Sequence, residues 1–231
     1  MKKNILILLL FIANSSFSQN MFNYHKDFET ILRQSQDSTS VLYYPKLLER
    51  FNDNDDTLTN SDIIALLIGH TTEENYKPYK TLKTEREIHK LVKLEKFDQA
   101  IIKSDSLLKI NPLNFSALME KSYSYMKLEK PNSEFHKKKF MKIVYSIMSS
   151  GDGTIKNPYF VLNPSDGATL IKYILGGKIG ITGSGDDSNG YFLDILEMIS
   201  KKETKTLHFN INHAAEKMFT KEEKEKIKNG G

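Results

Sequence analysis

The chain has 231 residues, of which 39% are hydrophobic, 10% aromatic and 27% charged, a balance typical of a globular protein rather than a disordered or fibrous one. Cysteine is absent, which excludes disulfides, thiolate metal sites and cysteine catalysis. The formal net charge of +4 includes Lys2 and Lys3, and so small an excess argues against nucleic acid as a partner.

The N-terminus has the pattern of an export signal. Lys2 and Lys3 precede an apolar run from Ile5 to Ala13, and Ser16-Phe17-Ser18 provides a small-x-small cleavage site. The apolar run is much shorter than the roughly 20 residues that cross a bilayer. We therefore expect residues 1–18 to be removed, leaving an exported protein, periplasmic or secreted, without a transmembrane segment.

Three short helices are expected in the front of the mature chain. Apolar residues at helical spacing predict the first over residues 22–33, and Pro45 suits the first turn of a second over residues 42–51. Thr59 or Asn60 would cap a third, which Gly69 is expected to end in the left-handed conformation. A connecting loop is expected to follow, over residues 71–80.

Regular helix pairs are expected between residues 85 and 148. The segment from Glu95 to Pro112 resembles the second helix and closing proline of a tetratricopeptide repeat, and Ala117 to Tyr125 resembles the first helix of the next. The glycine usual in the turn before Phe97 is missing. A stack this short needs flanking elements to cover its faces. A third helix is predicted from Ser133 to Met148.

After Gly151 the composition changes to short apolar runs separated by Gly, Asp, Ser and Asn. The segment Asn163-Pro164-Ser165-Asp166 is typical of a helix start, and Gly176-Gly177 is typical of its end. We therefore divide the mature chain into a helical region over residues 19–150, a small α+β region over residues 151–220, and a charged, disordered tail over residues 221–231.

A small antiparallel sheet is predicted near residues 178–212. Residues 206–211 alternate between apolar and polar side chains, the period of a half-buried strand. Residues 191–199 fit either a strand or a helix. A hairpin turn at Glu203-Thr204-Lys205 favours the strand.

Several stretches, in the right order along the chain, resemble a known family. They are Leu42 to Phe51, Asp55 to Thr59, Tyr76 to Tyr79, Ser149 to Gly153, Tyr191 to Glu197 and Leu207 to Ile211. The ordered set resembles DUF4919, a domain of unknown function in exported Bacteroidetes proteins. Two positions depart from that family's pattern, because Leu67-Ile68 precedes Gly69 where two tyrosines are usual, and Leu207-His208 precedes Phe209 where an aromatic residue is common. The resemblance implies a helical, repeat-like front and a strand-bearing C-terminal part, and it implies no activity.

Two acidic loops have some features of a calcium site. Asp53 to Thr57 places oxygen atoms at alternate positions, but Leu58 and Ile64 stand where a calcium loop needs Gly and Glu. Ser184 to Gly190 has the composition of a hairpin turn. We therefore interpret both loops as turns and predict no metal and no cofactor.

Other chemical patterns are also incomplete. His208, His213 and Glu216 are zinc-type donors, but a strand residue and later helical residues need not converge. Gly183-Ser184-Gly185 resembles half of a nucleophile elbow, whose outer glycine positions are Thr182 and Asp186 here. We therefore assign no catalytic residue.

The candidate ligand-binding residues are Asp152, Asp194 and His208. Asp152 lies between two glycines in Ser149 to Gly153, which could shape a ligand-holding turn, although a helix stop and a tight turn explain that motif more simply. Asp194 and His208 lie on the apolar runs that predict the sheet. A site would require these residues to meet in a cleft between the helical and strand regions.

The predicted fold class is α+β, mainly helical, with tetratricopeptide-like helix pairs followed by a small antiparallel β-sheet. Stacked helix pairs form concave faces that accept peptides or partner helices. We therefore favour an exported, non-enzymatic interaction module of the bacterial envelope, whose partner is an envelope protein or peptide. That interpretation requires a contiguous apolar or aromatic groove on the helical part.

Two alternatives remain open at this point. One is an envelope hydrolase or metal-dependent enzyme that uses Asp152, Asp194 or His208 between the helical and strand regions. The other is a subunit of a larger assembly with no ligand of its own.

Overall fold

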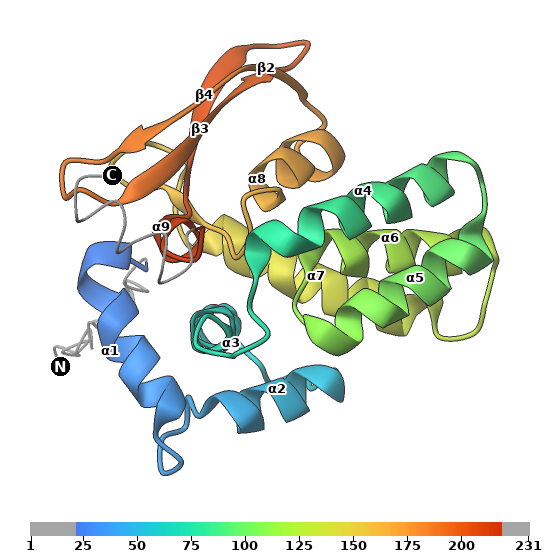
Figure 1. The fold of residues 1–231 in the computed structure, drawn as a ribbon, viewed down its shortest axis with the longest axis horizontal. Helices are drawn as coiled ribbons and strands as arrows, with labels where there is room; N and C mark the ends of the chain where they lie inside the picture. The colour runs from blue at the N-terminus through green and yellow to red at the C-terminus, as the bar shows by residue number, and fades with distance from the viewer. Residues whose placement is uncertain (1–21, 219–231) are drawn as a thin grey trace, which may run out of the picture.

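The computed structural model describes residues 22–218 (Figure 1). The expected export signal, residues 1–18, and the expected charged tail, residues 221–231, lie outside the described residues. The described chain is mainly helical with one small sheet, which confirms the α+β prediction. Within residues 22–218, no helix is both long and apolar enough to cross a membrane.

The first three helices form one side of the molecule, with α3 innermost. α1 spans Tyr24–Gln36, α2 spans Tyr44–Asn52 and α3 spans Asn60–His70, which confirms three predicted helices. A capping box between Thr59 and Asp62 begins α3. Contacts with α1, α2 and the later helix α7, Ser133–Ser149, bury α3 on nearly all sides.

Gly69 does not end α3 in the left-handed conformation. It lies inside the helix, which continues to His70. A Cβ atom on Gly69 would lie 3.0 Å from the Cβ atoms of Ser35 and Tyr44. The glycine is needed because α1 and α2 approach α3 closely, a tertiary reason that the local sequence does not contain.

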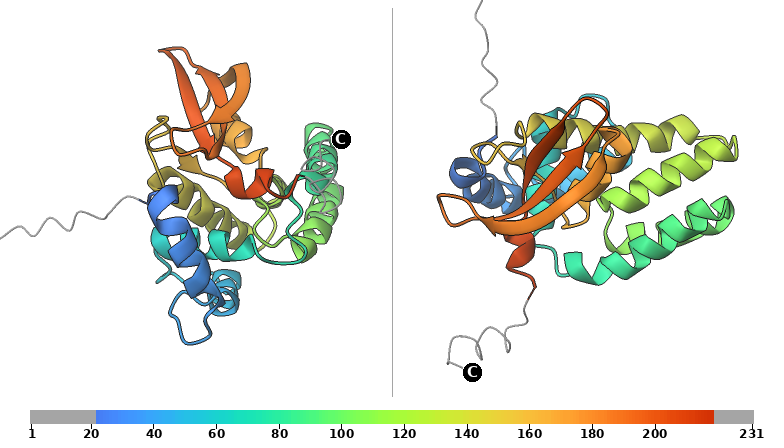
Figure 2. Two further views of the ribbon diagram at one scale, coloured as in Figure 1. Left: turned by 60° about the vertical axis from the view of Figure 1, so that its left-hand side comes forward. Right: turned by 90° about the horizontal axis from the view of Figure 1, so that it is seen from above.

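The next four helices form the opposite side of the molecule. α4 spans Pro78–Lys93, α5 spans Phe97–Ile110 and α6 spans Phe115–Lys127, and α7 follows. α4, α5 and α6 lie side by side, and α7 packs against α6 (Figure 2). The expected helix pairs are present, whereas their tetratricopeptide character stays a prediction. The loop expected over residues 71–80 is shorter, because α4 begins at Pro78.

The turn between α4 and α5 forms without a glycine. Glu95 adopts a φ of 56°, in the left-handed region. That conformation costs a residue other than glycine roughly 1–3 kcal/mol. The backbone N–H of Lys96 donates to the carbonyl oxygen of Leu91 at 2.9 Å and closes the turn. The missing glycine therefore adds strain but does not prevent the helix pair.

The C-terminal sheet is mixed rather than purely antiparallel. β1 spans Tyr159–Phe160, β2 spans Lys178–Asp186, β3 spans Phe192–Ile199 and β4 spans Thr204–Asn210, in the order β1-β4-β3-β2. β3 pairs antiparallel with both β2 and β4, but β1 runs parallel to β4. A strand of two residues has no visible period, which is why the sequence did not reveal it. The turn between β3 and β4 lies at residues 200–203, slightly before its expected position.

β2 lies at one edge of the sheet and pairs irregularly with β3. The register shifts between Ile179 and Thr182. There the backbone N–H of Ile181 donates to the carboxylate of Glu197 at 3.1 Å instead of to the opposite backbone. A Cβ atom on Gly180 would collide with the same carboxylate. The edge strand therefore contains a bulge that glycine permits.

Short helical segments connect the sheet to the rest of the fold. α8, Asp166–Thr169, continues into a π-helical turn, η1, Leu170–Ile174, and α9, Asn212–Ala215, follows β4. The backbone N–H of Asn163 donates to the Asp166 carboxylate at 2.8 Å, at the helix start that the sequence predicts. Gly176, with a φ of 68°, follows the segment in the left-handed conformation expected at its end.

The helical and strand regions share one core. The larger cluster of buried hydrophobic side chains includes Phe51 and Leu66 from the helices together with Leu196 and Phe209 from the sheet. All four are less than a tenth exposed. The boundary near residue 150 therefore divides the chain by composition but not by its core.

Two buried histidines belong to this core. The Nδ1 atom of His70 lies 2.8 Å from the Tyr44 hydroxyl oxygen. The Nε2 atom of His213 lies 3.3 Å from the carbonyl oxygen of Leu162, which also accepts the Tyr76 hydroxyl at 2.6 Å. Burial lowers the pKa of each histidine to about 4. Both imidazoles are therefore neutral at ordinary pH.

Candidate functional site

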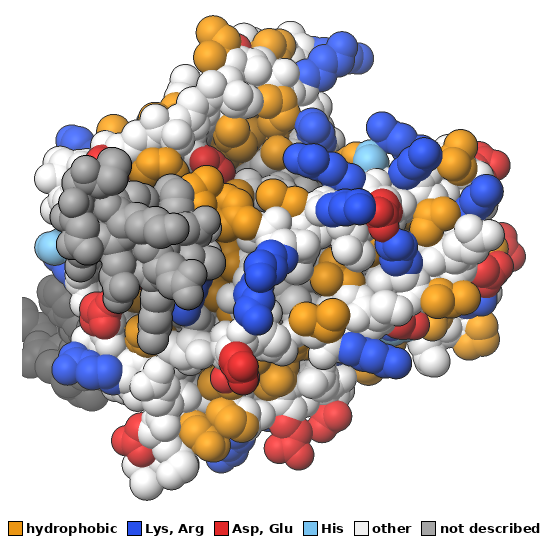
Figure 3. Space-filling model, in the orientation of Figure 1, with side chains coloured by type: hydrophobic (Ala, Val, Ile, Leu, Met, Phe, Trp, Pro, Cys, Tyr) orange, Lys and Arg blue, Asp and Glu red, His pale blue; other side chains and the backbone are white. Residues whose placement is uncertain are grey.

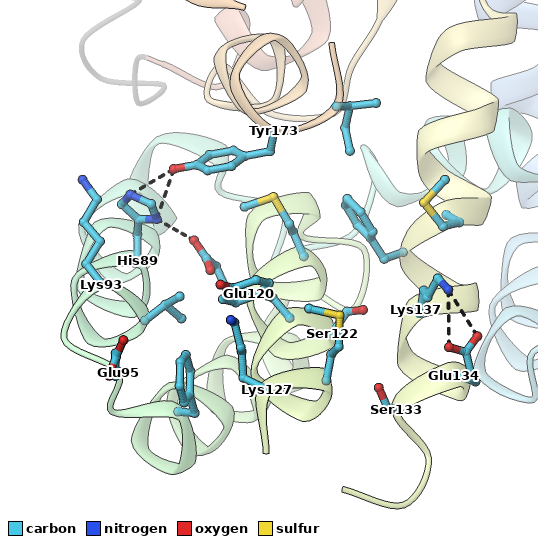
Figure 4. Close-up of a pocket in the computed structure, with 18 residues that line it drawn as sticks. His89, Lys93, Glu95, Glu120, Ser122, Lys127, Ser133, Glu134, Lys137 and Tyr173 are labelled. Atoms are coloured by element: carbon cyan, nitrogen blue, oxygen red, sulfur yellow. Dashed lines mark hydrogen bonds and ion pairs between the residues drawn. The ribbon is translucent and has the colours of Figure 1, made fainter. Parts of the chain in front are cut away.

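A groove of about 720 Å³ lies across α4, α6 and α7 and ends against η1 (Figure 4). Its lining is mainly apolar. The structure therefore contains the contiguous apolar groove that the interaction hypothesis requires of the helical part. Its principal apolar residues are Val92, Phe97, Met119, Tyr123, Met126 and Met141.

One face of α6 forms the floor of the groove. Met119, Tyr123 and Met126 follow one another at spacings of four and three residues, so their side chains lie on the same face of the helix. Tyr123 is 39% exposed and Met126 is 52% exposed, so protein covers this face only in part. Methionine side chains are flexible and adapt to ligands of different shape. The floor can therefore accept more than one apolar side chain.

Lysine side chains surround the groove. Lys137 pairs with Glu134 at 3.3 Å, whereas neither Lys93 nor Lys127 makes an ion pair with another residue between 22 and 218. In the space-filling view, Lys and Arg side chains gather over α4 and beside the segment formed by α8 and η1 (Figure 3). The Lys127 ammonium lies 5.4 Å from the centroid of the Tyr123 ring, and Glu95 also lines the groove. With Lys137 and Glu134 paired, the two remaining lysines outnumber Glu95, so the rim keeps a small positive charge that would attract an anionic ligand.

A hydrogen-bonded chain of three side chains closes one end of the groove (Figure 4). His89 on α4 places its Nδ1 atom 2.6 Å from Oε1 of Glu120 on α6, and its Nε2 atom 3.0 Å from the hydroxyl oxygen of Tyr173 on η1. Glu120 is only 4% exposed. Burial raises the pKa of its carboxyl group and outweighs the hydrogen bond from His89, which lowers it. This chain links α4, α6 and η1 at one point.

A second, polar pocket of about 420 Å³ begins beyond this chain. It lies between α4, α6 and the α8–η1 segment and shares His89, Glu120 and Tyr173 with the groove. The hydroxyl oxygens of Ser116 and Thr169 lie 3.4 Å apart in its lining. The apolar groove and the polar pocket therefore meet at the three linked side chains.

Glu85 anchors the wall of the polar pocket from within the protein. Its Oε1 atom accepts hydrogen bonds from the Thr81 hydroxyl at 2.8 Å and from the Asn114 amide at 2.7 Å, and its Oε2 atom accepts the Ser165 hydroxyl at 2.7 Å. Glu85 is 6% exposed. Three donors thus satisfy its carboxylate, which joins α4 to α6 and to the start of α8.

The structure does not bring the three candidate ligand-binding residues together. Asp194 and His208 lie on opposite faces of the sheet, because Asp194 is directly opposite Phe209 in the register, and His208 is the next residue along the strand. Asp152 lies in the turn that follows α7, far along the chain from both. Because Asp194 and His208 face opposite sides of the sheet, the three residues do not line one cleft.

The turn that contains Asp152 contacts His208 through Gly153, whereas Asp194 lies on the other face of the sheet. Asp152 is exposed and accepts the Thr154 backbone N–H at 2.9 Å, and hydrogen bonds from Thr154 hold the pKa of Asp152 below its ordinary value. Partial burial raises the pKa of Asp194 to about 6. His208 places Nδ1 3.2 Å from the carbonyl oxygen of Gly153. The surroundings of Asp152 are those of a tight turn.

The Gly151 turn gives a prediction about stability. A Cβ atom on Gly151 would lie 2.5 Å from the carbonyl oxygens of Asn157 and Pro158. Gly151→Ala is therefore expected to reduce the free energy of unfolding by about 1–3 kcal/mol, measured by urea denaturation. Gly183→Ala is the control, because a Cβ atom there meets nothing within 4 Å. Equal stability of the two variants would contradict the structural role of the turn.

Three carboxylates of the two acidic loops already have partners. Asp55 accepts the Arg50 guanidinium at 2.7 Å, and Asp56 pairs with Lys138. Asp187 accepts two backbone N–H groups of its own hairpin turn. Between residues 22 and 218, no three His, Asp or Glu side chains are grouped closely enough to hold a metal ion. The Gly-Ser-Gly sequence lies within β2 and not on a strand-to-helix turn.

Sequence reasoning missed His89, Glu120 and Tyr173. They lie on three separate elements, and no motif spacing connects them. The sequence contains one signal for Glu120. Met119, Tyr123 and Met126 form an apolar face on α6, and Glu120 is next to Met119 in the chain. A carboxylate beside such a face is a candidate buried acid. Its partners still required the tertiary structure.

A family model described as a domain of unknown function (DUF4919) matches residues 29–219. Searches of curated proteins and of solved structures found no match. The match covers the groove, the polar pocket and the sheet.

Proposed function

The chain belongs to the DUF4919 family, and because that description names no activity, we propose a function from the geometry of its groove. The protein is an exported, non-enzymatic module of the bacterial envelope that binds a peptide segment of a partner protein. The observation that carries this proposal is the partly exposed apolar floor formed by Met119, Tyr123 and Met126. The charged and then apolar N-terminal pattern supports export.

The expected occupant is an acidic peptide with apolar side chains on one face. An apolar groove of about 720 Å³ has room for a few such side chains. Burying them removes apolar surface from water on both partners. Lys93 and Lys127 at the rim, which pair with no carboxylate between residues 22 and 218, favour acidic residues beside them. A basic peptide would meet repulsion at the same positions.

The chemistry at His89 favours binding over hydrolysis. A hydrolase that uses His89 as a base needs a nucleophile on one ring nitrogen and an orienting acid on the other. Glu120 occupies the acid position, but the hydroxyl bonded to Nε2 is that of Tyr173. Within residues 22–218, no serine or threonine hydroxyl hydrogen-bonds to His89. The three residues therefore serve to join the walls of the site.

Met126→Glu is expected to weaken peptide binding at least tenfold, since it places a carboxylate on the apolar floor. Peptides would first be selected with the wild-type protein from a phage-displayed random library. Their affinities for wild type and variant would then be measured by fluorescence anisotropy. Met126 is 52% exposed, so the substitution should leave the fold intact, which circular dichroism would verify.

Ile102→Glu provides the matched control. Ile102 is an apolar helix residue with 67% exposure on α5, and it does not line the groove. The control should bind the selected peptides as wild type does. Peptides that bind wild type and Met126→Glu equally well would overturn the proposed function.

A further inference from the structure

The polar pocket beside the groove contains two cationic side chains that have no partner among the described residues. Arg86 on α4 and Lys172 on η1 line it and are both exposed. Within residues 22–218, neither side chain makes an ion pair or a hydrogen bond. Their charges therefore remain available to a ligand.

The acidic side chains of the same pocket are already engaged. Glu85 accepts three hydrogen bonds from within the protein, and Glu120 accepts one from His89. Both carboxyl groups are buried, with Glu85 6% and Glu120 4% exposed. The exposed charged groups of the pocket are therefore those of Arg86 and Lys172.

A hydroxyl donor lies in the same lining. The Thr169 hydroxyl donates to the carbonyl oxygen of Ser165 at 3.0 Å, so in its 3.4 Å contact with Ser116 the serine hydroxyl is the donor. A bond of 3.4 Å is long for two hydroxyl groups. A carboxylate oxygen is a stronger acceptor at a shorter distance. Ser116 can therefore turn its hydroxyl towards an entering carboxylate.

We propose that the polar pocket binds a carboxylate of the same peptide whose apolar side chains occupy the groove. Arg86 and Lys172 pair with the carboxylate, and the Ser116 hydroxyl donates to it. This inference rests on the proposed function and adds the chemistry of the ligand. The two sites meet at His89, Glu120 and Tyr173, so one continuous segment can reach both. The pocket thus sets where an acidic residue lies relative to the apolar ones.

The test uses the selected peptides and three glutamine variants of the full mature protein. Arg86→Gln and Lys172→Gln are each expected to weaken binding about three- to tenfold, less so at high salt. Lys90→Gln is the control, because Lys90 is an exposed cation on α4 that does not line the pocket. It should leave the affinity unchanged.

Peptide variants identify the carboxylate. Each Asp or Glu of a selected peptide would be replaced by its amide, and the C-terminus would be amidated in a separate peptide. When the relevant carboxylate is removed, Arg86→Gln should no longer weaken binding, as a double-mutant cycle requires. If Arg86→Gln no longer weakens binding of the amidated peptide, the carboxylate in the pocket is that of the C-terminus. If the weakening disappears when one Asp or Glu is replaced, the carboxylate belongs to that residue.

Failure of this inference differs from failure of the proposed function. Suppose that Met126→Glu abolishes binding but Arg86→Gln and Lys172→Gln both bind the peptides as wild type does. The proposed peptide-binding groove is then supported, and the proposed carboxylate site is wrong. Equal losses with Lys90→Gln would also overturn it, because the effect would then be one of overall charge. Tighter binding of a phosphoserine peptide than of its aspartate counterpart, dependent on Arg86 and Lys172, would replace a carboxylate by a phosphate ligand.

Discussion

Replacing Phe160 by alanine is expected to reduce the free energy of unfolding by about 3–5 kcal/mol. Phe160 is 1% exposed. Its ring centroid lies 5.4 Å from that of Phe22, 6.3 Å from that of Phe28 on α1 and 5.0 Å from that of His213 on α9. The substitution leaves a cavity where β1, α1 and α9 meet. Urea denaturation followed by circular dichroism would measure the loss.

The same experiment tests whether the two regions unfold together. Because the core is shared, far-ultraviolet dichroism of the helices and near-ultraviolet dichroism of the tyrosines should change in one coincident transition. Tyr145→Ala is the control, since Tyr145 is 58% exposed and should change stability by less than about 0.5 kcal/mol. Helices that keep their wild-type midpoint in Phe160→Ala would show that the helical region is a separate domain.

Removing both buried histidines should make the protein less sensitive to acid. When the pH falls from about 7 to about 5, the free energy of unfolding should decrease in the wild-type protein by about 4 kcal/mol more than in the triple variant Tyr44→Phe/His70→Phe/His213→Phe. Each histidine accounts for roughly 2 kcal/mol of that difference. Stability would be measured by urea denaturation at each pH. Tyr44 is changed together with His70 because its hydroxyl would otherwise lose its partner.

The sign follows from the lowered pKa values. The pKa of each histidine is about 4 in the folded protein and near 6.5 when unfolded. Between these values the unfolded chain binds more protons, so this contribution is present above about pH 6.5 and is lost as the pH falls towards 4. Asp166 and Asp194 act in the opposite sense, because burial raises the pKa of each carboxyl group. The comparison with a variant isolates the histidines from these acids.

Partial variants divide the effect between the two sites. Tyr44→Phe/His70→Phe and His213→Phe should each recover about half of the difference. The carbonyl oxygen of Leu162 keeps the Tyr76 hydroxyl as a donor when His213 is replaced. A triple variant with the wild-type pH dependence would show that the histidines are not buried in their neutral form.

Most of the helices could be predicted because their signals are local. Pro45 at a first turn, the Thr59 cap and the start at Asn163 to Asp166 act within a few residues of themselves. The role of Gly69 is not local, because it depends on two helices that pack against this residue. The parallel strand β1 likewise depends on its partner β4. Features that depend on distant partners were the ones missed.

The site was less predictable than the fold for the same reason. The apolar face of α6 was visible as a spacing, and a groove on the helical part was expected. The polar residues at the end of the groove, His89, Glu120 and Tyr173, come from α4, α6 and η1. They come together only because α8 and η1 pack against the helices. The candidates Asp152, Asp194 and His208 were chosen from motifs, and adjacent positions on neighbouring strands placed two of them on opposite faces.

The bulge in β2 affects how this protein meets other copies of itself. An exposed edge strand offers a template on which further chains can add strand by strand, the first step of amyloid-like aggregation. In β2 the register shift between Ile179 and Thr182, and the bond from Ile181 to the Glu197 carboxylate, interrupt the regular row of backbone groups. A bulge twists an edge strand and makes it a poorer template for a strand of another chain. The irregularity at Ile181 therefore makes the first part of β2 less suited to pairing between copies than a regular edge strand would be.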